Sequence, residues 1–314
     1  IAGVGSSYLL TQLLVDEFKV QPNFALGYSM GEASMWASLG VWTKPHELIS
    51  KTQTDPLFTS AISGELTAVR RAWQLKEQDA DIVWNSFVVR SEAAPIQALL
   101  GHYPHAYLAI IQGDTCVIAG CEQQCKALLA ALGKRGIAAN RVTAMHTPPA
   151  MEEHANVTRF YTEPLNDELP SAIQFISAAN LIGSTDKPVN SQPLTSEMLA
   201  QSIADTFCHT LDFTALIHSA QRQGAKLFVE MGADRQNCTL IDKIAKQDSK
   251  SAQQPCCTVP MNAKGSSDVT SLLKALGQLI SHKVPLSLQP FIDGLQRELA
   301  LCQLQANQVD QISS

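Results

Sequence analysis

The stretch Gly27-Tyr28-Ser29-Met30-Gly31-Glu32 decides how this chain is interpreted. The apolar residues 24–26 before it predict a buried strand, and residues 32–39 after it predict a helix that ends at Gly40. Strand, G-x-S-x-G and helix is the order of a nucleophile elbow, a tight turn that exposes a serine beside a helix N-terminus. The same short pattern also arises without a function. Ser29 is therefore either a nucleophile or a serine between two convenient glycines, and only a general base would decide between them.

Composition limits the possible classes of protein. The chain has 314 residues, of which 45% are hydrophobic and 17% are charged, as in globular proteins with a substantial core. Its net charge of -6 gives no reason to expect nucleic-acid binding. No apolar run is long enough to predict a membrane span, and no stretch is similar to a signal peptide. We expect a globular cytoplasmic protein of one large or two ordinary domains.

The eight cysteines predict neither a disulfide framework nor a metal site. Cys116, Cys121 and Cys125 lie close together, but their spacing is not that of a zinc site and no histidine accompanies them. We expect all eight to be reduced thiols and no metal to be bound.

Helix-like and strand-like patterns alternate along the chain, which is typical of an α/β fold. After Ser63-Gly64 the pattern changes for about eighty residues and predicts a small α+β unit inserted into a larger domain. Inside this unit, residues 65–73 (ELTAVRRAW) alternate like a half-exposed strand, with Arg70-Arg71 as a solvated strand edge. The sequence also predicts a strand pair over residues 106–111 and 115–119, and a helix over residues 121–134.

Outside the inserted unit, the predicted elements are those of the larger domain. They are helices over residues 7–18 and 46–54, strands over residues 173–177 and 226–231, a polar loop over residues 249–254, and a helix from residue 291 with little to bury against.

His146 is the candidate general base. It ends the inserted unit and precedes Pro148-Pro149, which hold the backbone in a rigid, extended form, and a rigid loop positions a base well. The residues alone leave other histidines open. These seven read as surface or packing residues: His46, His102, His105, His154, His209, His218 and His282.

Three motifs occur in an order that resembles a known family. GYSMGE, AMHTPPAM and LFVEMGADRQNCTLI are similar to the GHSxGE, HSPxM and EVGPxxxLT motifs of the malonyl/acyl-CoA:acyl-carrier-protein acyltransferase family. Weaker matches, such as DTCVIAG and TLDF, fall between them, and the resemblance runs from about residue 1 to residue 292. The segment GYSMGEASMWASLGVW most resembles the acyltransferase domain of the PfaB-type subunit of bacterial polyunsaturated fatty-acid synthases.

The resemblance implies roles for individual residues. Ser29 matches the nucleophile that takes the acyl group from a thioester, and His146 matches the base. The family orients this histidine through a backbone carbonyl, which the alignment places near Thr206. The Met30 N–H would supply half of the oxyanion hole.

The resemblance also implies a fold and partners. The fold would be an α/β hydrolase-like, parallel-sheet core, formed by residues 1–63 and 144–292, with a ferredoxin-like small subdomain over residues 64–143 and a C-terminal helix or linker over residues 293–314. The partners would be acyl-CoA, acyl carrier protein domains and other subunits of a fatty-acid or polyketide-type synthase. No cofactor is implied, because the substrates themselves carry CoA or phosphopantetheine.

Two departures from the family concern the substrate pocket. The family usually has an arginine about 25 residues after the serine, which pairs with the carboxylate of malonyl groups, whereas Thr54 stands at that position here. Tyr28 replaces a common histidine and reshapes the pocket. Because burying an unpaired carboxylate is costly, we expect a preference for acyl groups without one. Lys51, Arg70 and Arg71 are the nearest cations in the sequence that could replace the arginine.

The family's opening strand and its glycine-rich loop, which gives the second oxyanion N–H, have no counterpart here, so we expect either that the domain begins before residue 1 or that a segment has been cleaved. The sequence favours an acyltransferase of polyunsaturated fatty-acid biosynthesis. A thioesterase-like hydrolase with the same residues and a non-catalytic docking domain remain as alternatives.

Overall fold

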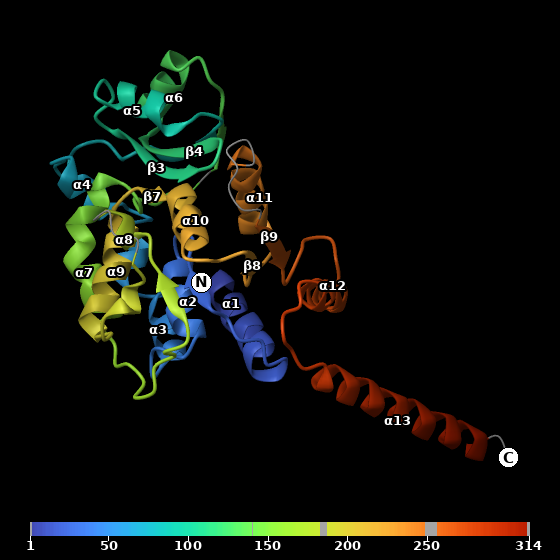
Figure 1. Ribbon diagram of the computed structural model, residues 1–314. Coiled ribbons are helices and arrows are strands. Elements are labelled where there is room, and N and C mark those ends of the chain that lie inside the picture. Colours follow the sequence, from blue (N-terminus) through green and yellow to red (C-terminus); the bar gives the residue numbers. More distant parts are fainter. Residues whose placement is uncertain (1, 140, 183–186, 249–255, 313–314) are drawn as a thin grey trace.

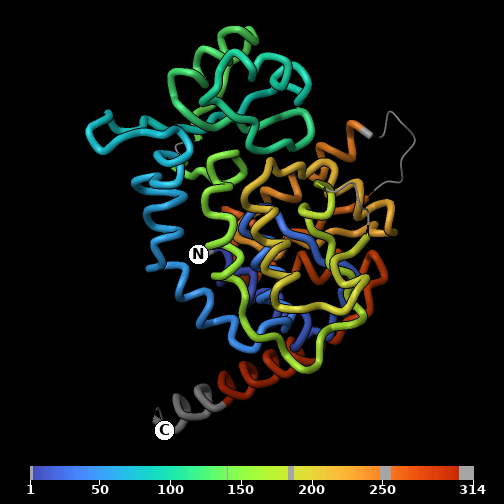
Figure 2. The backbone as a smooth tube through the Cα atoms, turned by 90° about the vertical axis from the view of Figure 1, so that its left-hand side faces the viewer, coloured from blue at the N-terminus to red at the C-terminus, as the bar shows by residue number. Residues whose placement is uncertain are grey.

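The computed structural model describes residues 2–139, 141–182, 187–248 and 256–312. A larger body carries a smaller unit above it, and the C-terminal helix α13 (Gln289–Ile312) extends away from the body (Figure 1). Figure 2, turned by 90°, shows the same arrangement, with the small unit at the top and α13 projecting at the bottom.

The core of the body contains two pairs of parallel strands. Strand β1 (Phe24–Leu26) pairs with β6 (Gln174–Ile176), and β8 (Leu227–Glu230) pairs with β9 (Cys257–Pro260). The sequence predicted β1, β6 and β8, and these predictions are confirmed; it missed β9. Parallel pairs joined by helical segments are typical of an α/β core.

Helices cover these strands. Helix α2 is enclosed on every side, because residues 32–38 are all buried. Trp36 of this helix stacks on Phe175 of β6, with ring centroids 4.3 Å apart. The helices and helical turns of the body are α1 (Ala2–Gln12), a π-helical turn (Leu13–Glu17), α2 (Gly31–Ser38), α3 (Pro45–Lys51), a second π-helical turn (Leu57–Ala61), α4 (Thr67–Ala72), a 3-10 helix (Pro148–Glu153), α7 (His154–Tyr161), α8 (Ala179–Ile182), a short 3-10 turn (Val189–Ser191), α9 (Ser196–Cys208), α10 (Phe213–Arg222), α11 (Gln236–Asp248) and α12 (Asp268–Ser281).

The small unit is a five-stranded sheet with two helices packed against it. Its strand order is β5 (Gly136–Ala138), β2 (Trp84–Val89), β4 (Thr115–Cys121), β3 (Ala106–Gln112) and β7 (Leu211–Asp212). All neighbours are antiparallel except β3 and β7. Helices α5 (Ala93–Leu100) and α6 (Glu122–Ala131) share an apolar cluster with the sheet. The predicted strand pair and helix are confirmed, and β7 links the unit to the body.

One predicted element of the small unit is wrong. Residues 65–73 are not a strand but contain the helix α4. Ala68 and Val69 are adjacent and both fully buried (0% exposed), which an edge strand facing solvent on one side does not allow. Arg71 forms an ion pair with Glu153 instead of lining a solvated strand edge. The sequence also missed β2.

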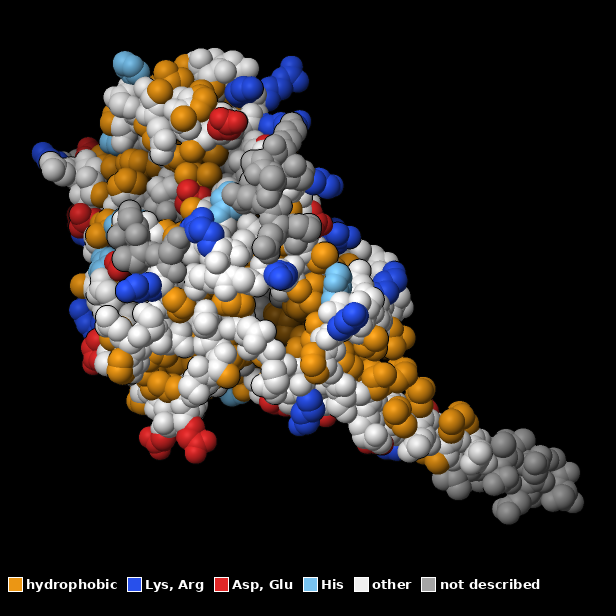
Figure 3. Space-filling view, in the orientation of Figure 1, with side chains coloured by type: hydrophobic (Ala, Val, Ile, Leu, Met, Phe, Trp, Pro, Cys, Tyr) orange, Lys and Arg blue, Asp and Glu red, His pale blue; other side chains and the backbone are white. Residues whose placement is uncertain are grey.

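The remaining predictions concern the two ends and one loop. The helix predicted over residues 7–18 divides into α1 and the π-helical turn that follows it. The predicted polar loop, residues 249–254, lies outside the described residues. The predicted C-terminal helix is α13, where Leu295, Leu299 and Leu301 are exposed; Figure 3 shows apolar side chains along it. None of the described helices has the length and apolar character needed to cross a membrane.

Candidate active site

Ser29 lies on a sharp turn between β1 and α2. Its backbone is left-handed, with φ +55°, which is uncommon for a residue other than glycine. The Gly31 N–H donates to the Tyr28 carbonyl, and the Glu32 N–H donates to the Ser29 carbonyl, both at a distance of 2.9 Å. At Gly27 a Cβ atom would lie 2.1 Å from the Glu32 nitrogen, so only glycine fits there, whereas a Cβ at Gly31 would meet open space. The turn therefore has the geometry of a nucleophile elbow and depends on Gly27.

His146 is the histidine that the structure places at this turn. Its Nε2 lies 2.7 Å from the Ser29 Oγ, inside the separation expected between a nucleophile and its base. The ring is buried, with 3% of the residue exposed. His146 also has a left-handed backbone, with φ +65°, and the 3-10 helix that begins at Pro148 follows it.

The C-terminal end of α9 holds His146 in place. The last carbonyls of a helix have no partner within the helix and are free to accept other hydrogen bonds. The Phe207 carbonyl accepts the His146 backbone N–H at 2.7 Å, and the Thr206 carbonyl lies 2.9 Å from the ring Nδ1. The His209 carbonyl lies 3.3 Å from the same nitrogen. The family resemblance implies an orienting carbonyl near Thr206, and nothing in the sequence points to His209.

These contacts define the tautomer of His146. Carbonyl oxygens only accept hydrogen bonds, so Nδ1 must carry the proton. Nε2 is then the acceptor and faces the Ser29 hydroxyl, which donates to it. Burial lowers the pKa of His146 from 6.5 to about 4, although the carbonyls of Thr206 and His209 act to raise it. The ring is therefore neutral at neutral pH and ready to take a proton from Ser29.

The backbone N–H of Met30 points to a further property of the turn. Met30 is the N-cap residue of α2, and its N–H has no hydrogen-bond acceptor among the described residues. An unsatisfied N–H at the start of a helix, next to a nucleophile, is suited to stabilise an oxyanion. No second donor of this kind is identified in the described part of the chain.

Tyr28 connects the turn with the small unit. Its hydroxyl donates to Gln112 Oε1 of β3 over 2.7 Å, and its ring meets Phe213 edge to face at 5.0 Å. Burial raises the pKa of Tyr28 to about 12, although the charge of Arg141 acts to lower it. Tyr28 thus remains protonated and fixes the turn against the sheet. The sequence did not single out Gln112, and nothing local to it indicates this role.

Thr54 is exposed in the turn after α3, and its backbone N–H donates to the Lys51 carbonyl. Its place in a substrate pocket stays a prediction. The three cations considered as substitutes for the missing arginine all have partners. Lys51 lies 2.7 Å from Glu163, Arg71 pairs with Glu153, and Arg70 donates to the carbonyl of Lys76.

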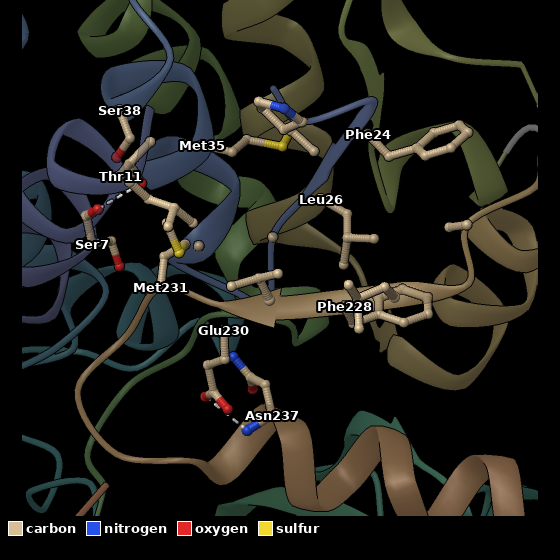
Figure 4. Close-up of a pocket in the computed structure, with 18 of the residues that line it drawn as sticks. Ser7, Thr11, Phe24, Leu26, Met35, Ser38, Phe228, Glu230, Met231 and Asn237 are labelled. Atoms are coloured by element: carbon tan, nitrogen blue, oxygen red, sulfur yellow. Dashed lines mark hydrogen bonds between the residues drawn. The ribbon is translucent and has the colours of Figure 1, made fainter. Parts of the chain in front are cut away.

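A cavity with a volume of about 490 Å³ lies behind the turn, between β1 and β8. Figure 4 shows Phe24 and Leu26 of β1 and Phe228 of β8 at its walls, with Ser7 and Thr11 of α1 on another side. Ser29 and His146 do not line it. The cavity therefore belongs to the core rather than to the Ser29 and His146 site.

Histidine, cysteine and acidic side chains are the usual metal ligands in proteins. The residues that the structure describes contain no cluster of three or more of them that could hold a metal ion. All eight cysteines are free: Cys116, Cys121, Cys125, Cys208, Cys238, Cys256, Cys257 and Cys302.

The chain is similar to known proteins in sequence and in fold. No protein-family model matches the chain. Among curated proteins, the chain is similar to a subunit of the polyunsaturated fatty acid synthase of Thraustochytrium sp., with 23% identity over 294 residues. The match covers 90% of this chain and 14% of the relative, so the chain spans only a small part of that protein's length.

Solved structures give the fold. The acyltransferase domain from the second module of the salinomycin polyketide synthase superposes with a TM-score of 0.68 at 17% identity, over 91% of this chain and 60% of that one. The malonyl-CoA:acyl carrier protein transacylase of Helicobacter pylori gives 0.66 at 18% identity, over 88% and 78%. A malonyl-transacylase solved in complex with its type II polyketide synthase carrier protein gives 0.65 at 13% identity, over 88% and 79%.

The chain therefore has the fold of these acyltransferase domains, an α/β hydrolase-like core with a small subdomain. The predicted fold class and the predicted resemblance are both confirmed.

Proposed function

We propose that this chain is a serine acyltransferase that works through an acyl-serine intermediate. One observation carries the proposal. Ser29 Oγ, His146 Nε2, His146 Nδ1 and the Thr206 carbonyl form a continuous hydrogen-bonded line of 2.7 and 2.9 Å on a strained turn. A nucleophile, a base and a group that orients the base are the minimum for nucleophilic catalysis. The acyltransferase fold supports the same conclusion.

The proposed reaction has two halves. In the first, Ser29 Oγ attacks the carbonyl carbon of a thioester while its proton passes to His146 Nε2. The C–S bond then breaks, the proton goes to the departing thiolate, and the acyl group remains on Ser29 as an ester. In the second half, an incoming thiol gives its proton to His146 and its sulfur attacks the ester. Ser29 regains the proton as the new thioester leaves.

The surroundings of Ser29 suit the charges that develop. The Met30 N–H would donate to the oxyanion of each tetrahedral intermediate. The carbonyls of Thr206 and His209 lie at the C-terminal end of α9, where the helix dipole favours positive charge, and would stabilise the imidazolium.

We propose acyl carrier protein domains as acceptors, with acyl-CoA or an acyl carrier protein as donor. The curated relative is named as a subunit of a polyunsaturated fatty acid synthase, and one structural neighbour was solved with its carrier protein. The reaction needs no cofactor beyond the CoA or phosphopantetheine of its substrates. A role in polyunsaturated fatty-acid synthesis in the cytoplasm, beside other synthase subunits, follows as part of the proposal.

Intact-mass spectrometry tests the proposal. The protein is incubated with a panel of acyl-CoA thioesters and then with a phosphopantetheinylated carrier protein. We expect a mass increase equal to one acyl group, followed by its appearance on the carrier protein. Loss of the acyl group to water, with none on the carrier, would instead support a thioesterase-like hydrolase. The absence of any acyl adduct would support a non-catalytic docking domain.

The acyl group itself is the subject of a first prediction. We expect a neutral acyl-CoA to acylate Ser29 faster than malonyl-CoA, because no arginine stands at Thr54 and the three nearby cations have partners. A charge-assisted hydrogen bond to a carboxylate contributes about 1.5–3 kcal/mol, or roughly tenfold to a hundredfold in relative rate. Thr54→Arg should raise the malonyl rate and leave the neutral rate nearly unchanged.

The matched control is Gln53→Arg, which adds the same charge at the neighbouring exposed position. A malonyl rate that exceeds the neutral rate tenfold in the unmodified protein would contradict the prediction and indicate another cation at the site.

A second prediction concerns pH. With a pKa of about 4, His146 remains neutral in the folded protein well below the usual histidine pKa of 6.5. At pH 5.5 we expect about 97% of the base to be neutral and active, against about 10% for an unperturbed histidine. The acylation rate measured between pH 4.5 and 8 should therefore fall little down to pH 5.5.

The lowered pKa of His146 also makes the stability of the folded protein depend on pH. The unfolded chain takes up the His146 proton below about pH 6.5, whereas the folded protein takes it up only near pH 4. The contribution of His146 to stability is therefore lost as the pH falls through this window. An acylation rate that halves near pH 6.5, in protein that is still folded, would contradict the assignment of a neutral buried base.

A further inference from the structure

Glu32 is a buried carboxyl that the proposed chemistry does not use. It lies three residues after Ser29 on α2 and has no exposed surface (0%). Two other buried carboxyls have evident partners: Glu153 pairs with Arg71, and Glu230 accepts the N–H groups at the start of α11. For Glu32 no ion pair is recorded with a described residue. Because burial of a carboxyl is costly, its presence here needs a reason.

Buried hydroxyls connect Glu32 with α9. Ser202 Oγ lies 3.2 Å from Glu32 Oε1 and 2.8 Å from Ser177 Oγ. Ser177 Oγ in turn lies 3.3 Å from Thr206 Oγ1. All four residues are buried, with exposed fractions between 0% and 6%. The network is therefore shielded from water, and each of its hydrogen bonds is stronger than at the surface.

The two ends of this network are the two halves of the active site. At one end, the Glu32 N–H donates to the Ser29 carbonyl over 2.9 Å. At the other end, the carbonyl of Thr206 lies 2.9 Å from His146 Nδ1. Elsewhere α2 and α9 contact each other through apolar side chains, which allow small sliding movements, whereas directional hydrogen bonds do not.

We infer that Glu32 is a positioning residue, which acts through Ser202 and Ser177 to fix the last turn of α9 relative to the turn of Ser29. By this means it keeps the Thr206 carbonyl in line with His146 Nδ1–H. The inference rests on the proposed function only for the meaning of that alignment, because the network itself is independent of any substrate.

The protonated form of Glu32 satisfies the network. Burial raises the pKa of Glu32 to about 7, although Ser177, Ser202 and the Trp36 indole act to lower it. Ser202 Oγ lies within donating distance of both Glu32 Oε1 and Ser177 Oγ but has one proton, so it cannot donate to both at once. If Glu32 is protonated, its carboxyl donates to Ser202, which leaves the Ser202 proton for Ser177 and the Ser177 proton for Thr206 Oγ1. Oε2 has no hydrogen-bond partner among the described residues, nor has the Trp36 indole N–H despite its proximity. An ionised carboxylate would leave a charged oxygen bare, so glutamine is a close mimic of the protonated side chain.

The test measures the ring nitrogens of His146 and the acylation rate in the same variants. With ¹⁵N-labelled histidine, the signals of His146 are identified by their loss in His146→Gln. The unmodified protein should show a proton on Nδ1 only. In Glu32→Ala we expect a mixture of tautomers and an acylation rate about a hundredfold lower, since a displacement of about 1 Å can cost that much. Glu32→Gln should restore the single tautomer and most of the rate.

Glu230→Ala is the matched control. It removes another buried carboxyl and should lower stability, but the His146 nitrogen signals should not change. If Glu32→Ala leaves these signals unchanged, or if Glu32→Gln fails as completely as Glu32→Ala, the inference is overturned and Glu32 only supports the fold.

The test still decides the role of Glu32 if the variant does not fold or if the protein is not acylated. If Glu32→Ala does not fold, Ser202→Ala interrupts the same network, and unchanged His146 signals in that variant overturn the inference. If the unmodified protein shows no acylation, the proposed function fails, while the nitrogen signals still decide the role of Glu32.

Discussion

Ser29→Ala is expected to abolish acylation of the protein by thioesters while the fold remains intact. The Ser29 Oγ, 2.7 Å from His146 Nε2, is the atom that would carry the acyl group, and alanine has no replacement for it. Serine and alanine both have a Cβ atom, so the strain of the left-handed backbone at this position is similar for both and we expect little change in stability. Intact-mass spectrometry should show no acyl adduct, and thermal unfolding should be nearly unchanged.

Ser38→Ala is the control, because Ser38 is a buried serine at the end of α2, the helix that follows Ser29, and its hydroxyl has no hydrogen-bond partner in the described part of the chain. It should be acylated like the unmodified protein. If Ser29→Ala still gains one acyl group, another residue is the nucleophile and the proposed function is wrong.

His146→Ala should have the second largest effect. Loss of a general base typically reduces a rate by about 10²–10⁴-fold, and the acylation rate should fall by this amount. Because only 3% of His146 is exposed, alanine leaves a cavity and lowers stability. His146→Gln fills more of that space and should lose the rate with a smaller loss of stability.

His154→Gln serves as its control. His154 lies 2.7 Å from Asp205 on the surface of α9, and no contact with Ser29 is recorded for it among the described residues. Its acylation rate should be close to that of the unmodified protein. An unimpaired His146→Gln would show that His146 is not the base.

Local chemistry explains what the sequence could predict of the site. The turn of Ser29 is formed by six consecutive residues, so its pattern is visible in the sequence, and the prolines after His146 are equally local. Glu32 stands in the same motif, but its partners Ser177 and Ser202 are about 150 residues away and have no distinguishing pattern. The orienting carbonyl at Thr206 could be predicted only through the family resemblance, because every residue has a backbone carbonyl and no residue type marks the one that is used.

The fold was predicted where patterns are regular and missed where tertiary contacts decide. The hairpin of β3 and β4 alternates clearly around the Gln112-Gly113-Asp114 turn and is confirmed. Residues 65–73 alternate as well, yet they contain the helix α4. Leu66 has a left-handed backbone before this helix, and Arg71 pairs with Glu153, far along the chain. Such contacts override the weak preference of six residues.

At Ser29 and His146, which have left-handed backbones, selection for stability and selection for activity favour different residues. A residue other than glycine in this conformation costs of order 1–3 kcal/mol and persists at functional sites because the surrounding structure enforces it. Glycine would relieve much of this strain at either position but would remove the chemistry. A descendant of this protein that no longer needed acyl transfer would therefore tolerate glycine at Ser29, whereas glycine at the buried His146 would also open a cavity. The strain at Ser29 gives such a lineage a route by which inactive copies drift towards greater stability.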